Sequence, residues 1–272
     1  STNDTFKEGN AVIAAYSDDK CTYGKVLWSW HIWLTDIPTE QEYKNNAGIM
    51  MDRNLGATSA TPGNTEVYGL IYQWGRKDPF LSATALLGNT RISSTTIWPD
   101  GVDVDNSTGS IQYATSHPMT LLFTSGYDWL YTGGSYNETR WSNPKTIYDP
   151  CPPGWKVPDG GDDGIFVIAS GITDQVDYAP YDKSLFAMNF KDVLCTQDCW
   201  FPFVPLAASD TYFRGRYNVG SNWSTYHTSS CTGGNYFDHL VYTFQLRRDD
   251  SAIGTSYWTK GGSTTSLRST CS

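Results

Sequence analysis

Hydrophobic and polar residues alternate over short stretches of this chain, which indicates β-strands joined by turns. Residues 11–16 and 25–34 both show the alternation, and a polar turn at residues 18–20 separates them. Because successive side chains of a strand point to opposite faces, Trp28 and Trp33 fall on different faces of the second strand. We therefore predict a hairpin whose two faces are both too apolar to lie in water.

Two stretches have the spacing of short helices. Residues 68–76 bring Leu70 and Trp74 within helical contact ahead of Gly75, a residue type that often ends helices. We expect this helix to be core scaffolding, the less favoured alternative being an aromatic platform for a sugar. Residues 164–171 lie between two glycines and predict a second helix, although the β-branched side chains there disfavour it.

From residue 82 to residue 146 the chain is polar and irregular, which predicts long loops. Only residues 118–123 are clearly apolar there and are expected to be buried, while residues 200–206 predict a core strand. Two acidic runs hold the oxygen ligands that calcium prefers, namely Asp100, Asp103, Asp105 and Asn106, and Asp159, Asp162 and Asp163. Neither run has the EF-hand spacing, so solvated loops are the simpler interpretation and no metal is predicted.

Composition narrows the class of protein. The chain of 272 residues is 39% hydrophobic and 15% aromatic but only 17% charged, a profile typical of a compact, loop-rich β protein with an aromatic surface. We expect one domain over residues 1–272. A net charge of −9 and the lack of a basic stripe argue against a nucleic-acid partner or an acidic membrane surface. No apolar run is long enough to span a bilayer, so direct membrane insertion is not expected.

The cysteines are even in number and scattered, as in exported proteins with disulfides: Cys21, Cys151, Cys195, Cys199, Cys231 and Cys271. Cys195 and Cys199 are close enough in sequence for a small-loop disulfide, which we predict. A redox motif is not expected, because no Cys-x-x-Cys is present. The alternative for the six residues is that some stay free and buried.

Residues 148–158 hold four prolines and a glycine, which fix the backbone and forbid a helix. We predict a rigid extended corner here, near the middle of the chain. Cys151 is placed to tie the corner covalently to another segment, and Trp155 is large enough to plug a core. These residues alone name no function.

The corner also carries a family resemblance. Its Cys-Pro-Pro-Gly-Trp-Lys-Val-Pro, residues 151–158, resembles the Cys-Pro-x-Gly-Trp-x-Val-Pro signature of the Fibrobacter major paralogous domain, a bacterial surface module. Four further blocks follow the order of that family: residues 27–33, 51–57, 68–80 and 267–268. The resemblance implies an α+β protein similar to the C-type lectin fold, with twisted antiparallel sheets, two short helices and long loops. It also implies an extracellular adhesin at the bacterial cell surface or fimbria tip.

Further expectations come from this resemblance. A pilus or surface-anchor domain would precede the chain in a larger protein and would be one partner. Residues 266–271 would lie near residues 26–34. The C-terminal strand would also meet the central corner, which implies a disulfide between Cys151 and Cys271 and leaves Cys21 and Cys231 as candidate partners. That link would stabilise the fold by roughly 4 to 5 kcal/mol in the chain-entropy model. The calcium-and-sugar triplets of true C-type lectins, Glu-Pro-Asn and Trp-Asn-Asp, are absent, which argues against calcium-dependent monosaccharide binding.

Function is expected in the C-terminal third. Residues 218–232 consist almost wholly of Asn, Ser, Thr, Tyr, Trp, His and Gly, and residues 233–246 alternate into a strand. This composition is typical of adaptable binding surfaces, although a polar loop under a hairpin is the alternative. The residues predicted to face an unidentified protein or glycan are Trp223, Tyr226, His227, Asn235, Tyr236, Asp238, His239 and Tyr242. The resemblance favours the binding surface, and some such modules are diversified here by retroelements.

Motifs of catalysis are weak. The sequence has no Gly-x-Ser-x-Gly, no His-Glu-x-x-His and no phosphate loop, and its histidines lack metal-ligand spacing: His31, His117, His227 and His239. His31 lies among tryptophans and is expected to be a hydrogen-bonded structural imidazole. We therefore predict neither an enzyme nor a cofactor. The alternatives are a structural minor pilin subunit and, less favoured, a relative of the formylglycine-generating enzymes.

Overall fold

The computed structural model describes residues 7–21, 25–82, 86–87, 91–92, 101–124, 128–131, 140–172, 176–177, 181–204, 206–208, 217–218, 223–231, 240–247, 252–259, 263–266 and 268–271. Strands make up 38% of the chain, whereas these ranges hold only two α-helices, of six residues each. The fold is therefore largely β, and the predicted α+β class is wrong. Neither described helix is long and apolar enough to cross a membrane.

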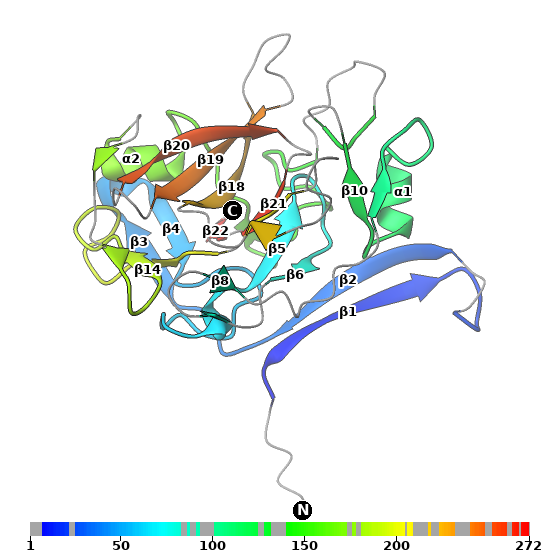
Figure 1. Cartoon of the computed structure of the whole chain (residues 1–272), viewed down its shortest axis with the longest axis horizontal. Helices are drawn as coiled ribbons and strands as arrows, with labels where there is room; N and C mark the ends of the chain where they lie inside the picture. The colour runs from blue at the N-terminus through cyan, green and yellow to red at the C-terminus, as the bar shows by residue number, and fades with distance from the viewer. Residues whose placement is uncertain are drawn as a thin grey trace, which may run out of the picture.

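A nine-stranded sheet forms the centre of the fold (Figure 1). In spatial order its strands are β12 (Val176–Asp177), β20 (Ala252–Thr259), β19 (Leu240–Arg247), β18 (Trp223–Cys231), β21 (Ser263–Ser266), β16 (Leu206–Ala208) and β17 (Tyr217–Asn218), while β5 (Leu70–Gln73) pairs with β21 and β6 (Phe80–Leu81) with β5. β18 and β21 run parallel, and β18, β19 and β20 form an antiparallel meander. The C-terminal third therefore supplies the middle of this sheet.

A four-stranded sheet joins three distant parts of the chain. Its order is β11 (Trp155–Lys156), β22 (Thr270–Cys271), β4 (Gly48–Met51) and β3 (Glu40–Tyr43). The predicted contact between the central corner and the C-terminal strand is confirmed, because Trp155 pairs with Cys271. Residues 26–34 do not pair with this strand, since Thr270 pairs with Met50 instead. The expected proximity of residues 26–34 to this strand therefore does not take the form of strand pairing, and it stays a prediction.

The predicted N-terminal hairpin is confirmed. It is a ribbon of two strands, β1 (Gly9–Tyr16) and β2 (Val26–Leu34), that passes below the rest of the molecule in Figure 1. One face packs inward, and Ser29 on it is only 2% exposed. On the other face Ile13 is 53% exposed and Trp30, its partner across the ribbon, is 48% exposed. The prediction that neither face could lie in water is therefore wrong for this outer face.

One of the two predicted helices is present. α2 (Ile165–Ser170) begins after Gly164 and ends at Gly171, whose φ of 71° is in the left-handed region that favours glycine. The other prediction is wrong, because residues 70–73 form β5, all four of whose side chains are buried. A strand buried on both faces shows no alternation, so periodicity cannot separate it from a buried helix. The sequence pattern did not predict the remaining α-helix, α1 (Ile111–Ser116).

Smaller strand pairings complete the described fold. β9 (Gly101–Asp103) runs parallel to β10 (Leu121–Phe123), and β7 (Leu86–Leu87) pairs with β8 (Arg91–Ile92). β13 (Tyr181–Asp182), β14 (Ala187–Asn189) and β15 (Trp200–Pro202) form a three-stranded sheet. β10 is fully buried, which confirms the C-terminal half of the segment predicted at residues 118–123, although Met119 is 41% exposed. β15 confirms the predicted core strand over residues 200–202 of 200–206.

The core consists of three clusters of buried side chains. The largest is built around four phenylalanines whose rings meet stacked or edge to face: Phe166, Phe190, Phe201 and Phe244. A second cluster contains Trp74 and Trp141, with ring centroids 5.5 Å apart, and Trp155 packs against it. The predicted plug by Trp155 is therefore confirmed. A third cluster surrounds Trp129 beside α1.

The central corner is extended, as predicted, and one carboxylate holds it in place. Asp149 accepts hydrogen bonds from the backbone N–H groups of Cys151 and Val157, each at 2.9 Å. The Lys145 ammonium donates to the same carboxylate at 2.5 Å and to the Cys151 carbonyl at 2.9 Å. Because the Asp149 side chain is only 3% exposed, losing it would leave two buried N–H groups and an ammonium without this partner.

Candidate functional site

The structure does not present Tyr226 and His227 to a ligand. Both lie on β18 in the middle of the nine-stranded sheet, and each is only 1% exposed. The Tyr226 hydroxyl donates to the Pro202 carbonyl at 2.6 Å, and the His227 ring packs edge-on against Trp141, with 5.9 Å between centroids. Residues 224–228 are all buried, so both faces of the strand are covered. The predicted ligand-facing role of Tyr226 and His227 is therefore wrong.

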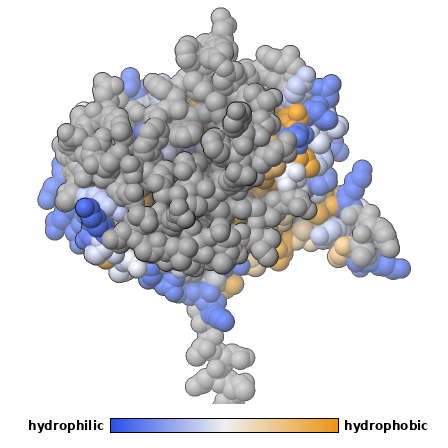
Figure 2. All heavy atoms as spheres, viewed as in Figure 1, coloured by the Kyte–Doolittle hydropathy of each residue, from blue (hydrophilic) through white to orange (hydrophobic). Residues whose placement is uncertain are grey.

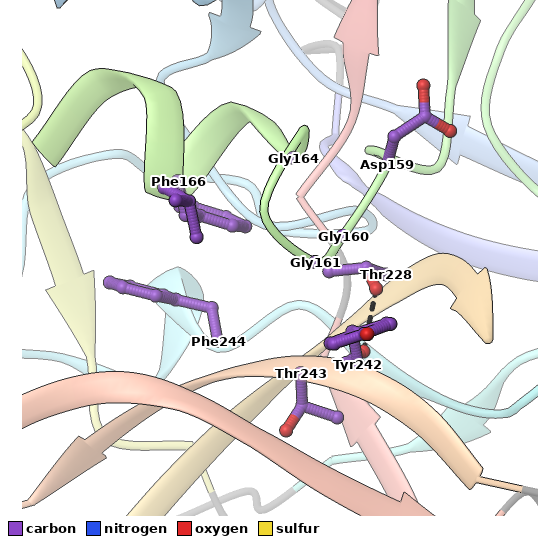
Figure 3. Close-up of a pocket in the computed structure, with 10 residues that line it drawn as sticks. Asp159, Gly160, Gly161, Gly164, Phe166, Thr228, Tyr242, Thr243 and Phe244 are labelled. Carbon is purple, nitrogen blue, oxygen red and sulfur yellow. Dashed lines mark hydrogen bonds between the residues drawn. The ribbon is translucent and has the colours of Figure 1, made fainter. Parts of the chain in front are cut away.

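Tyr242 lines a small pocket between β19 and the segment before α2 (Figure 3). The pocket holds about 10 Å³, which is room for about one water molecule. The Thr228 hydroxyl donates to the Tyr242 carbonyl at 2.6 Å, and a Cβ added at Gly160 would lie 2.1 Å from that hydroxyl oxygen. The three residues are thus tightly packed, and this pocket is too small for a sugar or a peptide.

For the other predicted ligand-facing residues the structure describes only the backbone of Trp223. Trp223 begins β18, where its backbone pairs with Arg247. Four more lie outside the described residues: Asn235, Tyr236, Asp238 and His239. The described part of the C-terminal third therefore contributes mainly core strands.

An open groove of about 830 Å³ lies between the turn end of the ribbon and α1. It is lined from the ribbon by Lys25, Val26, Leu27 and Trp28, from α1 and the segment before it by Ser107, Ser110, Ile111, Gln112, Tyr113, Thr115, Ser116 and His117, and by Tyr148. Figure 1 shows the ribbon passing below α1, and Figure 2 shows hydrophobic surface on the same side of the molecule. The volume falls within the range of about 300 to 1,000 Å³ that is common for small-ligand sites.

α1 forms one wall of the groove. The Ser110 hydroxyl accepts a hydrogen bond from the Tyr113 N–H at 3.0 Å and so caps the helix. Tyr113 and His117 are four residues apart, and their rings stack with centroids 3.9 Å apart and planes at 13°. His117 Nδ1 lies 3.0 Å from the Tyr113 carbonyl oxygen and 2.9 Å from the Ser116 hydroxyl. The wall is therefore a two-ring platform whose imidazole is held by contacts to its own helix.

Trp28 forms the opposite wall. The Lys77 ammonium lies 4.4 Å from the centroid of its ring, and the Tyr148 ring centroid lies 6.2 Å away. Lys77 also donates to the Ser29 carbonyl at 2.9 Å and to Asp78 Oδ1 at 2.7 Å. Burial lowers the pKa of Lys77, although the Asp78 charge opposes this shift. This buried network fixes the position of the Trp28 ring.

The groove was not predicted from the sequence, although two residue spacings in α1 indicate the helix that forms its wall. Ser110 stands three residues before Tyr113, which is the spacing of a helix cap, and Tyr113 stands four residues before His117. A helix of six residues is shorter than the window over which a 3.6-residue period can be recognised. α1 and Trp28 are also far apart in sequence, so local sequence pattern does not show that they lie close together in the fold.

The predicted link between Cys151 and Cys271 is not present, and all six cysteines are free thiols. Cys151 is buried. Burial raises the pKa of Cys151 well above its usual range, and the nearby Asp149 charge adds to the shift. Cys271 lies two residues beyond Ser269 on β22, opposite Trp155.

The predicted disulfide between Cys195 and Cys199 is also not present, but the two thiols are in contact. They share a hydrogen bond, and the Tyr43 hydroxyl lies 3.5 Å from Cys199 Sγ. Burial raises the pKa of Cys199, whereas the Cys195 thiol, the Arg268 charge and the Tyr43 hydroxyl lower it, and the net direction is down. Cys199 is therefore the member of the pair that more readily becomes a thiolate.

His31 is a structural imidazole, as predicted. Its Nε2 lies 2.8 Å from Asn10 Oδ1, and its Nδ1 lies 3.4 Å from the Tyr72 hydroxyl. Burial lowers the pKa of His31 to about 4, with the Asp78 charge opposing the shift, so the ring is neutral at physiological pH. Over the part of the chain that the structure describes, no three His, Cys, Asp or Glu side chains gather to hold a metal ion.

Comparisons of the chain with protein-family models, curated proteins and solved structures give no match. The geometry of the groove and the sequence resemblance of the central corner are therefore the features that indicate a function.

Proposed function

We propose that this chain is the ligand-binding domain of an extracellular bacterial surface adhesin and that the groove between the ribbon and α1 is its binding site. The observation that carries the proposal is the combination of aromatic rings and short polar side chains around one open groove. Rigid rings supply contact area at small entropic cost, and hydroxyl and amide groups supply directional hydrogen bonds. The resemblance at residues 151–158 supports the surface location and a pilus or surface-anchor domain as partner.

The lining of the groove favours binding over catalysis. Nδ1 of His117 contacts both the Tyr113 carbonyl and the Ser116 hydroxyl. The described residues that line the groove include no carboxylate and no cysteine, so no acidic group from that set orients this Ser116–His117 pair for catalysis. Binding without chemical conversion is therefore the simpler role.

A structural subunit of a surface fibre is the second candidate. It is favoured by the outer face of the ribbon, where Ile13, Trp30 and Leu34 are 53%, 48% and 44% exposed. Within the described residues β1 pairs only with β2, so its other edge is open to an added strand. A subunit of this kind would use the outer face of the ribbon, whereas an adhesin would use the groove.

Two tryptophans on β2 distinguish these candidates. The purified chain would be probed on glycan and protein arrays, and any ligand found would be titrated against Trp28→Ala and Trp30→Ala variants. If the groove binds the ligand, Trp28→Ala weakens binding by upwards of about 2 kcal/mol and Trp30→Ala leaves it unchanged. His117→Ala serves as a second groove variant in case Trp28→Ala unfolds the ribbon. Loss of binding in Trp30→Ala alone would reject the groove and favour the structural subunit.

A further inference from the structure

The groove differs from the rest of the molecule in its charge. The chain holds 28 Asp and Glu against 19 Lys and Arg, yet the charged side chain among the described lining residues is the cation Lys25. Lys25 takes part in no ion pair with a described residue. An anionic ligand is repelled by most of this surface but meets an available ammonium at the groove.

One carboxylate beside the lining is Asp105, which contacts Ser107. Its Oδ1 accepts from the Ser107 N–H and hydroxyl, each at 2.7 Å, and from the Thr108 N–H at 2.9 Å. These bonds from the Ser107 hydroxyl and the two N–H groups lower the pKa of Asp105, because they stabilise its ionised carboxylate within the turn. The carboxylate is thus occupied by its own turn, and Lys25 remains the available charge for a ligand.

The neutral part of the lining indicates the chemistry of the rest of the ligand. Gln112, Thr115 and Ser116 place an amide and two hydroxyls beside the rings of Trp28 and Tyr113. A sugar ring matches this arrangement, because its C–H face packs on an aromatic ring while its hydroxyls form hydrogen bonds at its edge. A peptide strand that added to a sheet would instead need a row of free backbone groups.

We propose that the groove binds an acidic glycan, with the sugar rings packed against Trp28 and the Tyr113–His117 pair and the sugar carboxylate paired with Lys25. This inference depends on the proposed function, since it names the ligand class of the same groove. Glycans that carry a carboxylate on a sugar ring supply both features at once, the polar ring and the negative charge. A neutral glycan would leave the Lys25 ammonium without a partner.

The test compares acidic glycans with their neutral parents, such as sialyl-lactose with lactose and a glucuronic-acid disaccharide with its glucose counterpart. Affinities of the whole chain would be measured at low and high salt. We expect at least one acidic glycan to bind about tenfold or more tightly than its parent, and the preference to shrink at high salt because the pair is exposed to solvent. Lys25→Met should abolish the preference, whereas Lys183→Met, at an exposed lysine outside the groove, should not.

The outcomes separate the inference from the proposed function. If groove variants abolish binding of neutral glycans or of a peptide, and no acidic glycan is preferred, the ligand class is wrong and the adhesin function stands. If a sulfated glycan binds as tightly as the carboxylated one, the assignment of a carboxylate is wrong. If no ligand responds to Trp28→Ala or His117→Ala, both the groove and the ligand class are rejected.

Discussion

At the scale of single residues, Asp149 holds the central corner through two backbone N–H groups and the Lys145 ammonium. We expect Asp149→Ala to lower the free energy of unfolding by about 3 to 5 kcal/mol, because it leaves a partly buried ammonium and two buried N–H groups unpaired. Urea denaturation measures the change. Asp198→Ala is the matched control, since Asp198 pairs with Lys191 at 3.9 Å on the surface and should cost less than about 1 kcal/mol. Similar losses in both variants would contradict this account.

His31 gives the stability a specific dependence on pH. Its pKa is about 4 in the folded protein and near 6.5 in the unfolded chain, so the unfolded state binds more protons between these values. Stability is therefore lost as the pH falls from about 6.5 towards 4. Between pH 7 and about 4.5 the wild type should lose on the order of 2 kcal/mol more than His31→Gln, as followed by denaturation at both values. An equal loss in the two proteins would show that His31 is not the group responsible.

At the scale of elements, the turn after β5 depends on the absence of a side chain at Gly75. Gly75 and Gly154 both have positive φ, at 77° and 81°. A Cβ added at Gly75 would lie 2.8 Å from Arg140 Cδ, whereas a Cβ added at Gly154 would have no neighbour within 4 Å. Gly154→Ala should cost about 1 to 2 kcal/mol from backbone strain alone. Gly75→Ala should cost clearly more, because Arg140 lies inside the core, where it is ion-paired with Asp128. Equal unfolding free energies for the two variants would show that Arg140 moves aside freely.

Some of the helices and strands could be predicted from the sequence pattern, and others could not. The hairpin and α2 were predictable, because one has clear alternation and the other lies between Gly164 and Gly171. β5 was mistaken for a helix because its buried residues lack a polar face, and α1 was missed because six residues are too few to show a period. The type of an element can thus be predicted from sequence where one of its faces is exposed to solvent or where a capping residue is present. It is ambiguous where the element has neither.

For the whole molecule, composition identified an aromatic-rich β protein but not the place of the candidate site. Tyr226 and His227 have the residue types of a binding surface, yet the strand that carries them is in the middle of a sheet covered on both faces. The groove instead depends on the approach of Trp28 to Tyr113, which are separated by 85 positions in sequence but line one space in the fold. Such a contact follows from tertiary packing, and neither local period nor composition encodes it directly.

The cysteines allow a test of how the whole molecule responds to oxidation. Cys195 and Cys199 are in contact and Cys199 has a lowered pKa, so the Cys199 thiolate can attack oxidised glutathione and release one glutathione thiolate. The Cys195 sulfur, losing its proton, can then displace the second glutathione from the mixed disulfide on Cys199. Refolding with oxidised glutathione, which takes up the two electrons, should therefore link these two residues, as read by non-reducing peptide mapping. The five-residue loop would add about 2 kcal/mol in the chain-entropy model, so dithiothreitol should lower the unfolding midpoint of the wild type but not that of Cys195→Ser. Recovery of both thiols free after oxidation, or a link from Cys199 to another cysteine, would overturn this expectation.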